Sequence, residues 1–287
     1  MSNDVNAGQP RAVTASISGA VDSGASSPGA VTTIPRLENT RLVVLTGALP
    51  LLVFMAAWFV EPGWSYVATA AVLAGFMLVL GQAISGTPFG VLINERNLMS
   101  LSRFQAAVWT VVVVAGYLTM VVARIKAGKA NAVDVGIPQE LWWAMGISAT
   151  SLLGTPLILG GKRLRQPDAK VMELTAAQLP DENAKNIDAQ RQGILYANPN
   201  IQDARISDIF QGDEVGNTAH VDLAKVQMFY FTAIAAVSYF ADVSMAVMRG
   251  ATDGLPALSE GFVALLAISH GGYLVSKSTD HSNSKPG

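Results

Sequence analysis

The 287-residue chain contains no cysteine, and charged residues make up only 14% of it. Without cysteine it can form no disulfide, no thiolate metal site and no cysteine nucleophile. The formal net charge is −2, so the charge balance gives no reason to expect nucleic acid as a partner. We therefore expect none.

Soluble-enzyme motifs are also missing. The sequence has no GxxxxGK[ST], HExxH or GxSxG motif, and its three histidines, His220, His270 and His281, are scattered. We therefore predict no catalytic residues, no cofactor and no metal site, and we expect that the protein is not an enzyme.

The chain is instead rich in apolar sequence. Hydrophobic residues make up 51% of it and gather in blocks of about twenty, the length that spans about 30 Å of hydrocarbon. We predict an all-α integral membrane protein with six transmembrane helices arranged as three hairpins. The predicted spans are Leu42–Val60, Tyr66–Ile84, Phe104–Ala123, Leu141–Gly160, Val226–Met248 and Leu255–Ser276.

Polar stretches divide the rest of the chain. Residues 1–35 are rich in Ala, Ser, Gly and Thr, which predicts a disordered N-terminal tail. Residues 161–222 form the sizeable water-facing segment, and residues 278–287 a polar tail that we expect to be disordered. The three hairpins occupy residues 36–84, 85–160 and 223–277.

The second and third hairpins echo each other. Leu101-Ser-Arg103-Phe-Gln105 followed by Trp109 matches Leu223-Ala-Lys225-Val-Gln227 followed by Phe231. Further along, Ile147-Ser148 matches Ile268-Ser269, and each copy ends at a lysine. We predict an internal repeat whose anchors at the inner ends of the spans are Arg103, Gln105, Trp109, Lys225, Gln227 and Phe231.

Basic residues near the span ends predict the orientation. With both termini in the cytoplasm, the inner flanks hold Arg36, Arg41, Arg96, Arg103, Lys162, Arg163, Arg165, Lys225 and Lys277, and the outer flanks only Arg124, Lys126, Lys129 and Arg249. The repeat hairpins then enter from the same side and are parallel, and residues 161–222 are cytoplasmic.

Arg103-x-Gln105-x3-Trp109 with Gly146-Ile-Ser148, and Lys225-x-Gln227-x3-Phe231 with Ala267-Ile-Ser269-His-Gly-Gly-Tyr273-Leu, resemble an uncharacterised family of bacterial multi-pass membrane proteins. The resemblance covers roughly residues 100–277. It implies the same helical fold and a place in the bacterial inner membrane, and it implies no activity. The first copy departs from it, with Ala149-Thr150-Ser151 where the second has His270-Gly271-Gly272.

His270 is the sharpest functional candidate. It lies about 10 Å inside its predicted span, where an ionisable side chain needs a partner or a water-filled cavity. It either relays protons or gates ions, or, as a neutral imidazole, it holds helices together by bonding a neighbour such as Ser148 or Ser269.

Two acidic residues near the outer ends are further candidates. Asp242 shares one helical face with Gln227, Phe231, Ile234 and Ser238, and this face could line a polar pathway with Asp242 as a cation-attracting ring. Alternatively, Asp242 meets water or Arg249 at the headgroup level. Glu260 either lines the mouth of the same pathway or caps its helix together with Ser259.

Two functional hypotheses follow. The first is a homo-oligomeric ion channel or transport component of the bacterial inner membrane. The second is a non-conducting membrane scaffold or sensor that binds a cytoplasmic protein partner through residues 161–222.

Overall fold

The computed structural model describes residues 39–179 and 186–286. The predicted N-terminal tail and Arg36 lie outside them. The described chain is mainly helical, with seven α-helices. Five of these are long and apolar enough to cross a membrane: α1 (Asn39–Phe59), α2 (Pro62–Ser85), α3 (Leu101–Lys126), α4 (Gln139–Gly160) and α6 (Leu223–Met248). The prediction of a mainly helical chain with several membrane-length helices is confirmed.

The last long helix, α7 (Glu260–Ser278), is not among these five. It has 19 residues and carries Glu260, His270 and Lys277, which lower its hydropathy. It nevertheless packs against both α4 and α6. The count of six spans therefore depends on α7.

Local sequence explains several helix ends. α2 begins at Pro62, where a missing N–H costs nothing, and ends at Ser85, where Gly86 caps it with a φ of 72°. The carboxylate of Asp222 caps α6 by accepting a hydrogen bond from the Ala224 amide at 2.9 Å. The hydroxyl of Ser259 caps α7 in the same way.

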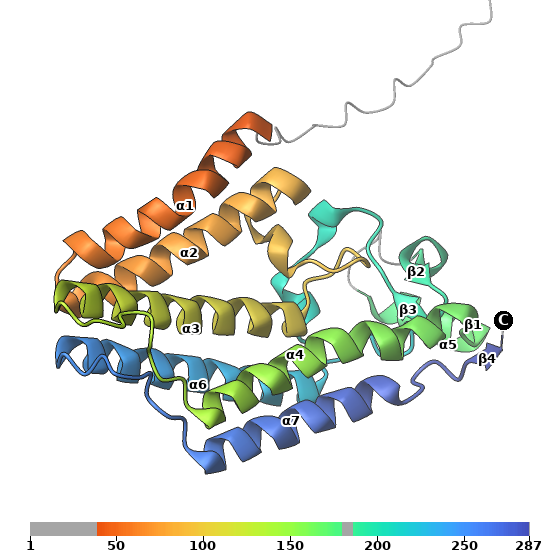
Figure 1. Ribbon diagram of the computed structural model, residues 1–287. Helices are drawn as coiled ribbons and strands as arrows, with labels where there is room; N and C mark the ends of the chain where they lie inside the picture. Colours follow the sequence, from red (N-terminus) through yellow and green to blue (C-terminus); the bar gives the residue numbers. More distant parts are fainter. Residues whose placement is uncertain (1–38, 180–185, 287) are drawn as a thin grey trace, which may run out of the picture. The chain divides into compact units, whose positions relative to one another are not determined.

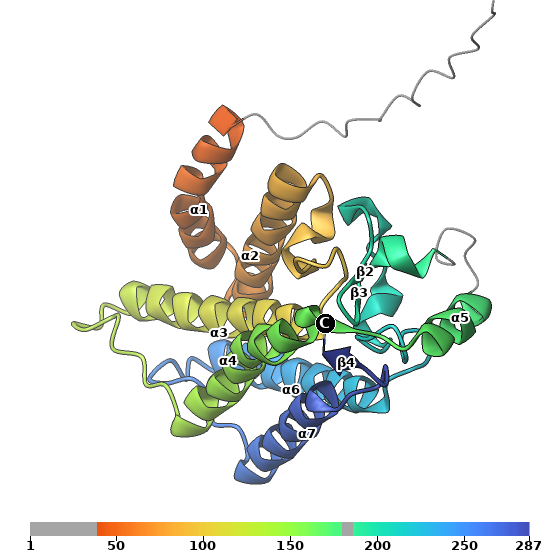
Figure 2. The same cartoon turned by 90° about the vertical axis from the view of Figure 1, so that its right-hand side faces the viewer.

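The long helices form layers around α3 and α6. Figure 2 shows α1 and α2 on one side of α3, and α4 and α7 on the other. The larger apolar core lies between these layers, with Tyr66, Trp109, Leu141, Tyr239 and Leu266 among its buried members. Because nearly every long helix contributes, this core fixes the bundle as one packed unit.

Outward-facing positions on these helices are also apolar. Val43, Leu157, Val237 and Ile268 are 63%, 79%, 71% and 69% exposed. Large apolar side chains at this density suit contact with lipid better than contact with water. The surface of the bundle therefore agrees with insertion into a membrane.

Polar segments gather at one end of the helices, on the right in Figure 1. We call this group the cap: residues 86–100, 161–179, 186–222 and 279–286. Its elements are η1 (Pro88–Leu92), η2 (Gly161–Leu164), β1 (Arg165–Gln166), α5 (Ala169–Gln178), η4 (Ile187–Gln190), β2 (Arg191–Gln192), β3 (Leu195–Tyr196), η5 (Ile201–Asp203), η6 (Ile206–Ile209) and β4 (Lys285–Pro286). β2 pairs antiparallel with β3. The water-facing segment of the sequence is thus folded onto the helix ends.

The polar C-terminal residues, which the composition predicted to be disordered, differ from that expectation. Strand β4 pairs antiparallel with β1, so that Arg165 faces Pro286 and Gln166 faces Lys285. Composition could not foresee this, because the partners lie more than a hundred residues earlier in the chain.

At the opposite end, the α3–α4 and α6–α7 loops lie together. Gly136 forms a parallel bridge with Gly254, the residues just before Ile137 and Leu255. Arg124 lies 2.9 Å from the carboxylate of Asp253, which also pairs with Lys129. Contacts between the two loops thus join the hairpins at this end.

A glycine in α2 gives a direct test of the packing between α2 and the cap. A Cβ at Gly81 would overlap the carbonyl oxygen of Pro88 and stand 2.8 Å from the Gly90 amide nitrogen. We expect Gly81→Ala to destabilise the detergent-purified protein by about 1–3 kcal/mol, the usual cost of overpacking. The control is Gly75→Ala on the same helix, whose added Cβ meets no atom of the described residues within 4 Å. Equal unfolding temperatures for the two variants would contradict this packing.

Candidate functional site

His270 lies in a buried polar layer where four helices meet. The side chain is 4% exposed. Its Nδ1 lies 2.6 Å from Ser151 Oγ of α4, and its Nε2 lies 3.3 Å from Gln105 Nε2 of α3. The same amide nitrogen donates to Thr232 Oγ1 of α6 at 2.6 Å. One layer of side chains therefore links α3, α4, α6 and α7.

The hydrogen-bond pattern assigns a protonation state to His270. Because Gln105 Nε2 is a donor in this orientation of the amide, His270 Nε2 must accept. The ring proton then lies on Nδ1 and is donated to Ser151 Oγ. A neutral imidazole that bridges helices is the packing role predicted as the alternative to proton relay, although its partners are Ser151 and Gln105 and not Ser148 or Ser269.

A second polar layer lies one helical turn closer to the cap. Ser102 Oγ is 3.0 Å from the hydroxyl of Tyr273 and 3.3 Å from Thr155 Oγ1. On the far side of the His270 layer, the buried hydroxyls of Ser148 and Ser269 have no hydrogen-bond partner in the described part of the chain. Gln105 Oε1 is likewise without one.

The polar layers end at an apolar barrier. Beyond them toward the loops, the space between the helices is filled by Trp109, Ala144, Ala235, Tyr239 and Leu266. The hydrogen-bonded layers thus end at about the depth of His270, and the buried hydroxyls of Thr119 and Tyr239 further along have no hydrogen-bond partner among the described residues. We conclude that these layers set the packing and register of the bundle, and that they form no continuous hydrogen-bonded path through the described part of one chain.

The strongest electrostatic feature lies in the cap, at Asp213. Its Oδ1 is 2.5 Å from Arg96 Nη2, and its Oδ2 is 2.5 Å from Lys277 Nζ and 3.1 Å from Lys225 Nζ. All three cations are buried, between 2% and 5% exposed. One carboxylate thus joins the loop before α3, the start of α6 and the end of α7.

Neighbouring charges set the ionisation of Asp213. Burial alone would raise the pKa of this carboxyl, but the positive charges of Lys225, Lys277 and Arg96 outweigh it and hold the pKa well below its ordinary value. Asp213 is therefore anionic at neutral pH.

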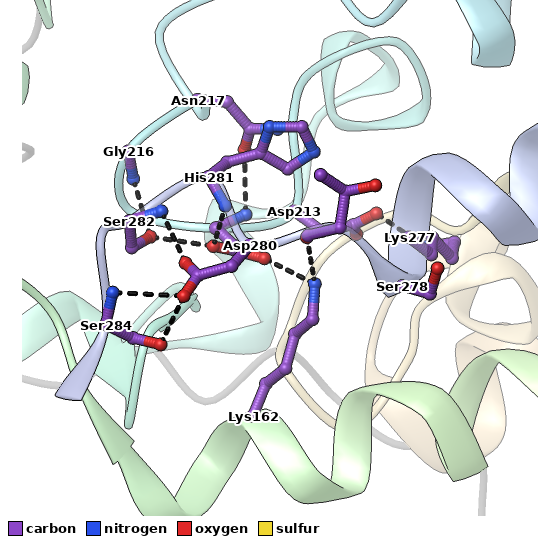
Figure 3. A network of polar contacts seen from close by, with 12 residues as sticks. Lys162, Asp213, Gly216, Asn217, Lys277, Ser278, Asp280, His281, Ser282 and Ser284 are labelled. Carbon is purple, nitrogen blue, oxygen red and sulfur yellow. Dashed lines mark hydrogen bonds and ion pairs between the residues drawn. The ribbon is translucent and has the colours of Figure 1, made fainter. Parts of the chain in front are cut away.

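Glu214, the next residue, performs a similar task for α4 and the C-terminus. It pairs with Lys162 at the end of α4 and accepts hydrogen bonds from the His281 amide at 2.9 Å and Ser282 Oγ at 2.8 Å. Lys162 also donates to the Thr279 carbonyl at 2.6 Å. Figure 3 shows these groups converging from η2 and the C-terminal segment. These bonds explain why the polar C-terminal residues are ordered.

The remaining predicted pathway residues lie elsewhere. Asp242 and Ser238 are exposed on the outer face of α6, and Glu260 is exposed in the first turn of α7. Asp242 forms no ion pair within the described residues, so the predicted contact with Arg249 is absent. The structure therefore separates the candidates into a buried set (Ser148, Ser269 and His270) and an outward set (Ser238, Asp242 and Glu260).

The repeat anchors occupy unequal environments. Gln105 and Trp109 are buried in the bundle, whereas Gln227 is exposed and Phe231 half-buried. Lys225 is buried against Asp213, whereas Arg103 is half-exposed and lies 3.7 Å from Glu95. A common role as anchors at the inner ends of the spans therefore does not describe both copies.

Sequence reasoning missed Asp213, Glu214 and the role of Arg96. A partial signal was present, because Lys162, Lys225 and Lys277 all stand at predicted inner helix ends, and residues 161–222, predicted on the same side, contain the adjacent acids Asp213 and Glu214. As for metals, no group of three or more His, Asp or Glu side chains in residues 39–179 and 186–286 is placed to hold an ion.

Comparison with known proteins adds no relative: no family model, curated protein or solved structure matches the chain. The resemblance given by the repeat motifs stays a prediction.

Removing the Asp213 charge tests the importance of the cluster. We expect Asp213→Asn to destabilise the protein by about 3–5 kcal/mol, because three buried cations lose their common anion. Asp188→Asn removes an equal charge from an exposed pair with Arg191 and should change stability by less than about 1 kcal/mol. Chemical unfolding in detergent compares the two, and equal effects would contradict a central role for Asp213.

The same variant should change the response to acid. Since the folded-state pKa of Asp213 is lowered, its contribution to stability is present above about pH 4 and is lost as the pH falls through the folded-state value. Wild-type protein should therefore lose more stability than Asp213→Asn when acidified below about pH 4. Parallel stability curves for the two proteins would count against this assignment.

Proposed function

We propose that the protein is a homo-oligomeric ion channel or transport component of the bacterial inner membrane, in which the outer face of α6 lines a water-filled path between subunits. The observation that carries this proposal is the exposed polar stripe on α6, formed by Gln227, Ser238 and Asp242.

The depth of the stripe supports this proposal. Asp242 lies six residues before Met248, the last residue of α6, which is about 9 Å along the helix. Ionisable residues within a span almost always face a bundle interior or a water-filled cavity and avoid lipid. The surrounding Ile234 and Val237 are 54% and 71% exposed, so no other described helix covers this face. A second copy of the chain would cover it.

The proposal includes six spans and a parallel repeat. α7 packs against α4 and α6, as expected of a sixth span. The bridge between Gly136 and Gly254 joins equivalent positions of the two copies and supports an origin by duplication. In this proposal both termini and the cap are cytoplasmic.

The scaffold remains a second candidate. It is favoured by Leu164 and Leu174, two large apolar side chains of the cap that are 79% and 55% exposed. Either could contact a cytoplasmic protein partner.

Substitution of the stripe tests conduction. In liposomes that contain purified protein, we expect Asp242→Asn to reduce potassium flux several-fold, because the ring that attracts cations loses its charge. The matched control is Asp134→Asn, which removes one exposed acid from the loop at the same end of the helices and should leave flux unchanged. If the purified wild-type protein is monomeric and shows no potassium flux, the channel hypothesis is wrong and the scaffold hypothesis is favoured.

The cysteine-free chain allows a clean test of orientation. Ala177→Cys places one thiol on the exposed face of α5 in the cap, and Val133→Cys places one in the α3–α4 loop, where Val133 is 69% exposed. A membrane-impermeant maleimide should label Val133→Cys in intact spheroplasts and Ala177→Cys only after permeabilisation. The reverse pattern would invert the proposed topology.

A further inference from the structure

A cavity of about 560 Å³ lies between α2 and α4, which both pack on α3. Its apolar wall includes Met77 and Leu80 of α2, Ala106 and Ala107 of α3, and Leu152 and Leu159 of α4. This volume is typical of a site for a small molecule. Neither the predicted ion path nor the His270 layer uses it.

The cap-side end of this cavity is polar and carries excess positive charge. Arg103, Glu95, Asn94 and Arg96 line it. Glu95 lies 3.7 Å from Arg103 and 3.3 Å from Arg163, so two half-exposed guanidinium groups share one carboxylate. Arg96 is held by Asp213, which it shares with Lys225 and Lys277. Arg103 and Arg163 together therefore leave at least one positive charge unmatched at the mouth.

This order of polar and apolar groups follows the depth of a bilayer. Arg103 lies in the first turn of α3, and Thr110, also in the cavity wall, lies about 10 Å further along the helix. If α3 spans the membrane, the arginines stand at the headgroup level and the apolar wall lies among the acyl chains. The cavity thus places charged groups at one end and apolar groups at the other, which is the order of groups in a phospholipid.

We propose that the cavity binds a phospholipid with an anionic headgroup. An acyl chain occupies the apolar part between α2 and α4. The phosphate accepts hydrogen bonds from Arg103 and Arg163 and competes with Glu95 for them, because guanidinium groups bind phosphate in bidentate geometry. A zwitterionic lipid binds less well because its ammonium group opposes the excess positive charge. The site is independent of whether the protein conducts ions.

Native mass spectrometry of the full-length, delipidated protein provides the test. The probes are phosphatidylglycerol and phosphatidylcholine with identical acyl chains. We expect preferential retention of phosphatidylglycerol, and a loss of about tenfold in its affinity in Arg103→Gln, as expected when a charge-assisted pair is removed. The control Arg165→Gln removes an equally accessible charge from the same end, where Arg165 contacts Asp280, and should bind as wild type.

Two more variants separate a built site from general attraction to a basic surface. Glu95→Gln removes the competing carboxylate without touching the apolar wall, so retention of phosphatidylglycerol should increase. Ala107→Trp fills the cavity and should abolish both lipid adducts while thermal unfolding shows an intact fold.

Several outcomes would overturn the proposal. These are equal binding of the two lipids, equal effects of Arg103→Gln and Arg165→Gln, or unchanged or weaker binding in Glu95→Gln. Loss of an oligomer in Ala107→Trp with unchanged lipid adducts would assign the cavity to a second copy of the chain instead.

Discussion

The adjacent carboxylates of Asp213 and Glu214 hold the cap-side ends of the helices together. Asp213 binds the loop before α3, the start of α6 and the end of α7, and Glu214 binds the end of α4. Burying these cations costs several kcal/mol each, and the arrangement is stable only because each finds an anion or a carbonyl. The cluster thus adds little to the net stability of the fold, but it fixes the relative positions of the helix ends. Any displacement of one helix end would leave a buried charge without its partner.

The cluster also shapes what lies next to it. Arg96 is fixed by Asp213 and by the carbonyls of Tyr196 and Asp213, each at 3.0 Å. Its loop therefore has a fixed position against Gly81 of α2, and this loop forms the polar end of the cavity between α2 and α4. Deeper in the bundle, hydrogen bonds from His270 replace ion pairs as the contacts between the same helices. Charges thus hold the bundle at the cap, and neutral groups hold it between the long apolar helices.

Apolar blocks predict the helices well and their partners poorly. The predicted span Leu141–Gly160 corresponds to α4, which begins two residues earlier, and Leu42–Val60 differs from α1 by a few residues at its start. Hydropathy reports where a chain prefers lipid, which is a local property. The contacts of His270 with Ser151 and Gln105 join residues 119 and 165 positions apart, and periodicity carries no information on such pairs. The disorder predicted from composition for the C-terminal residues fails for the same reason. The bonds that order this segment come from Glu214, which is distant in the sequence, and the segment has no apolar core of its own.

The difference between α3 and α6 shows how similar sequence motifs can lie on an inner and an outer helix. Gln105 and Gln227 hold equivalent positions, yet the first lies in the bundle and the second faces outward. α3 contacts α1, α2, α4 and α6, whereas α6 contacts α2, α3 and α7. The first hairpin therefore packs more fully on α3 than on α6, and it leaves the polar stripe of α6 bare. A chain that had to stay monomeric in lipid would gain stability by replacing Asp242 with an apolar residue. Retaining an acid there is understandable if another copy provides the contact that the first hairpin does not.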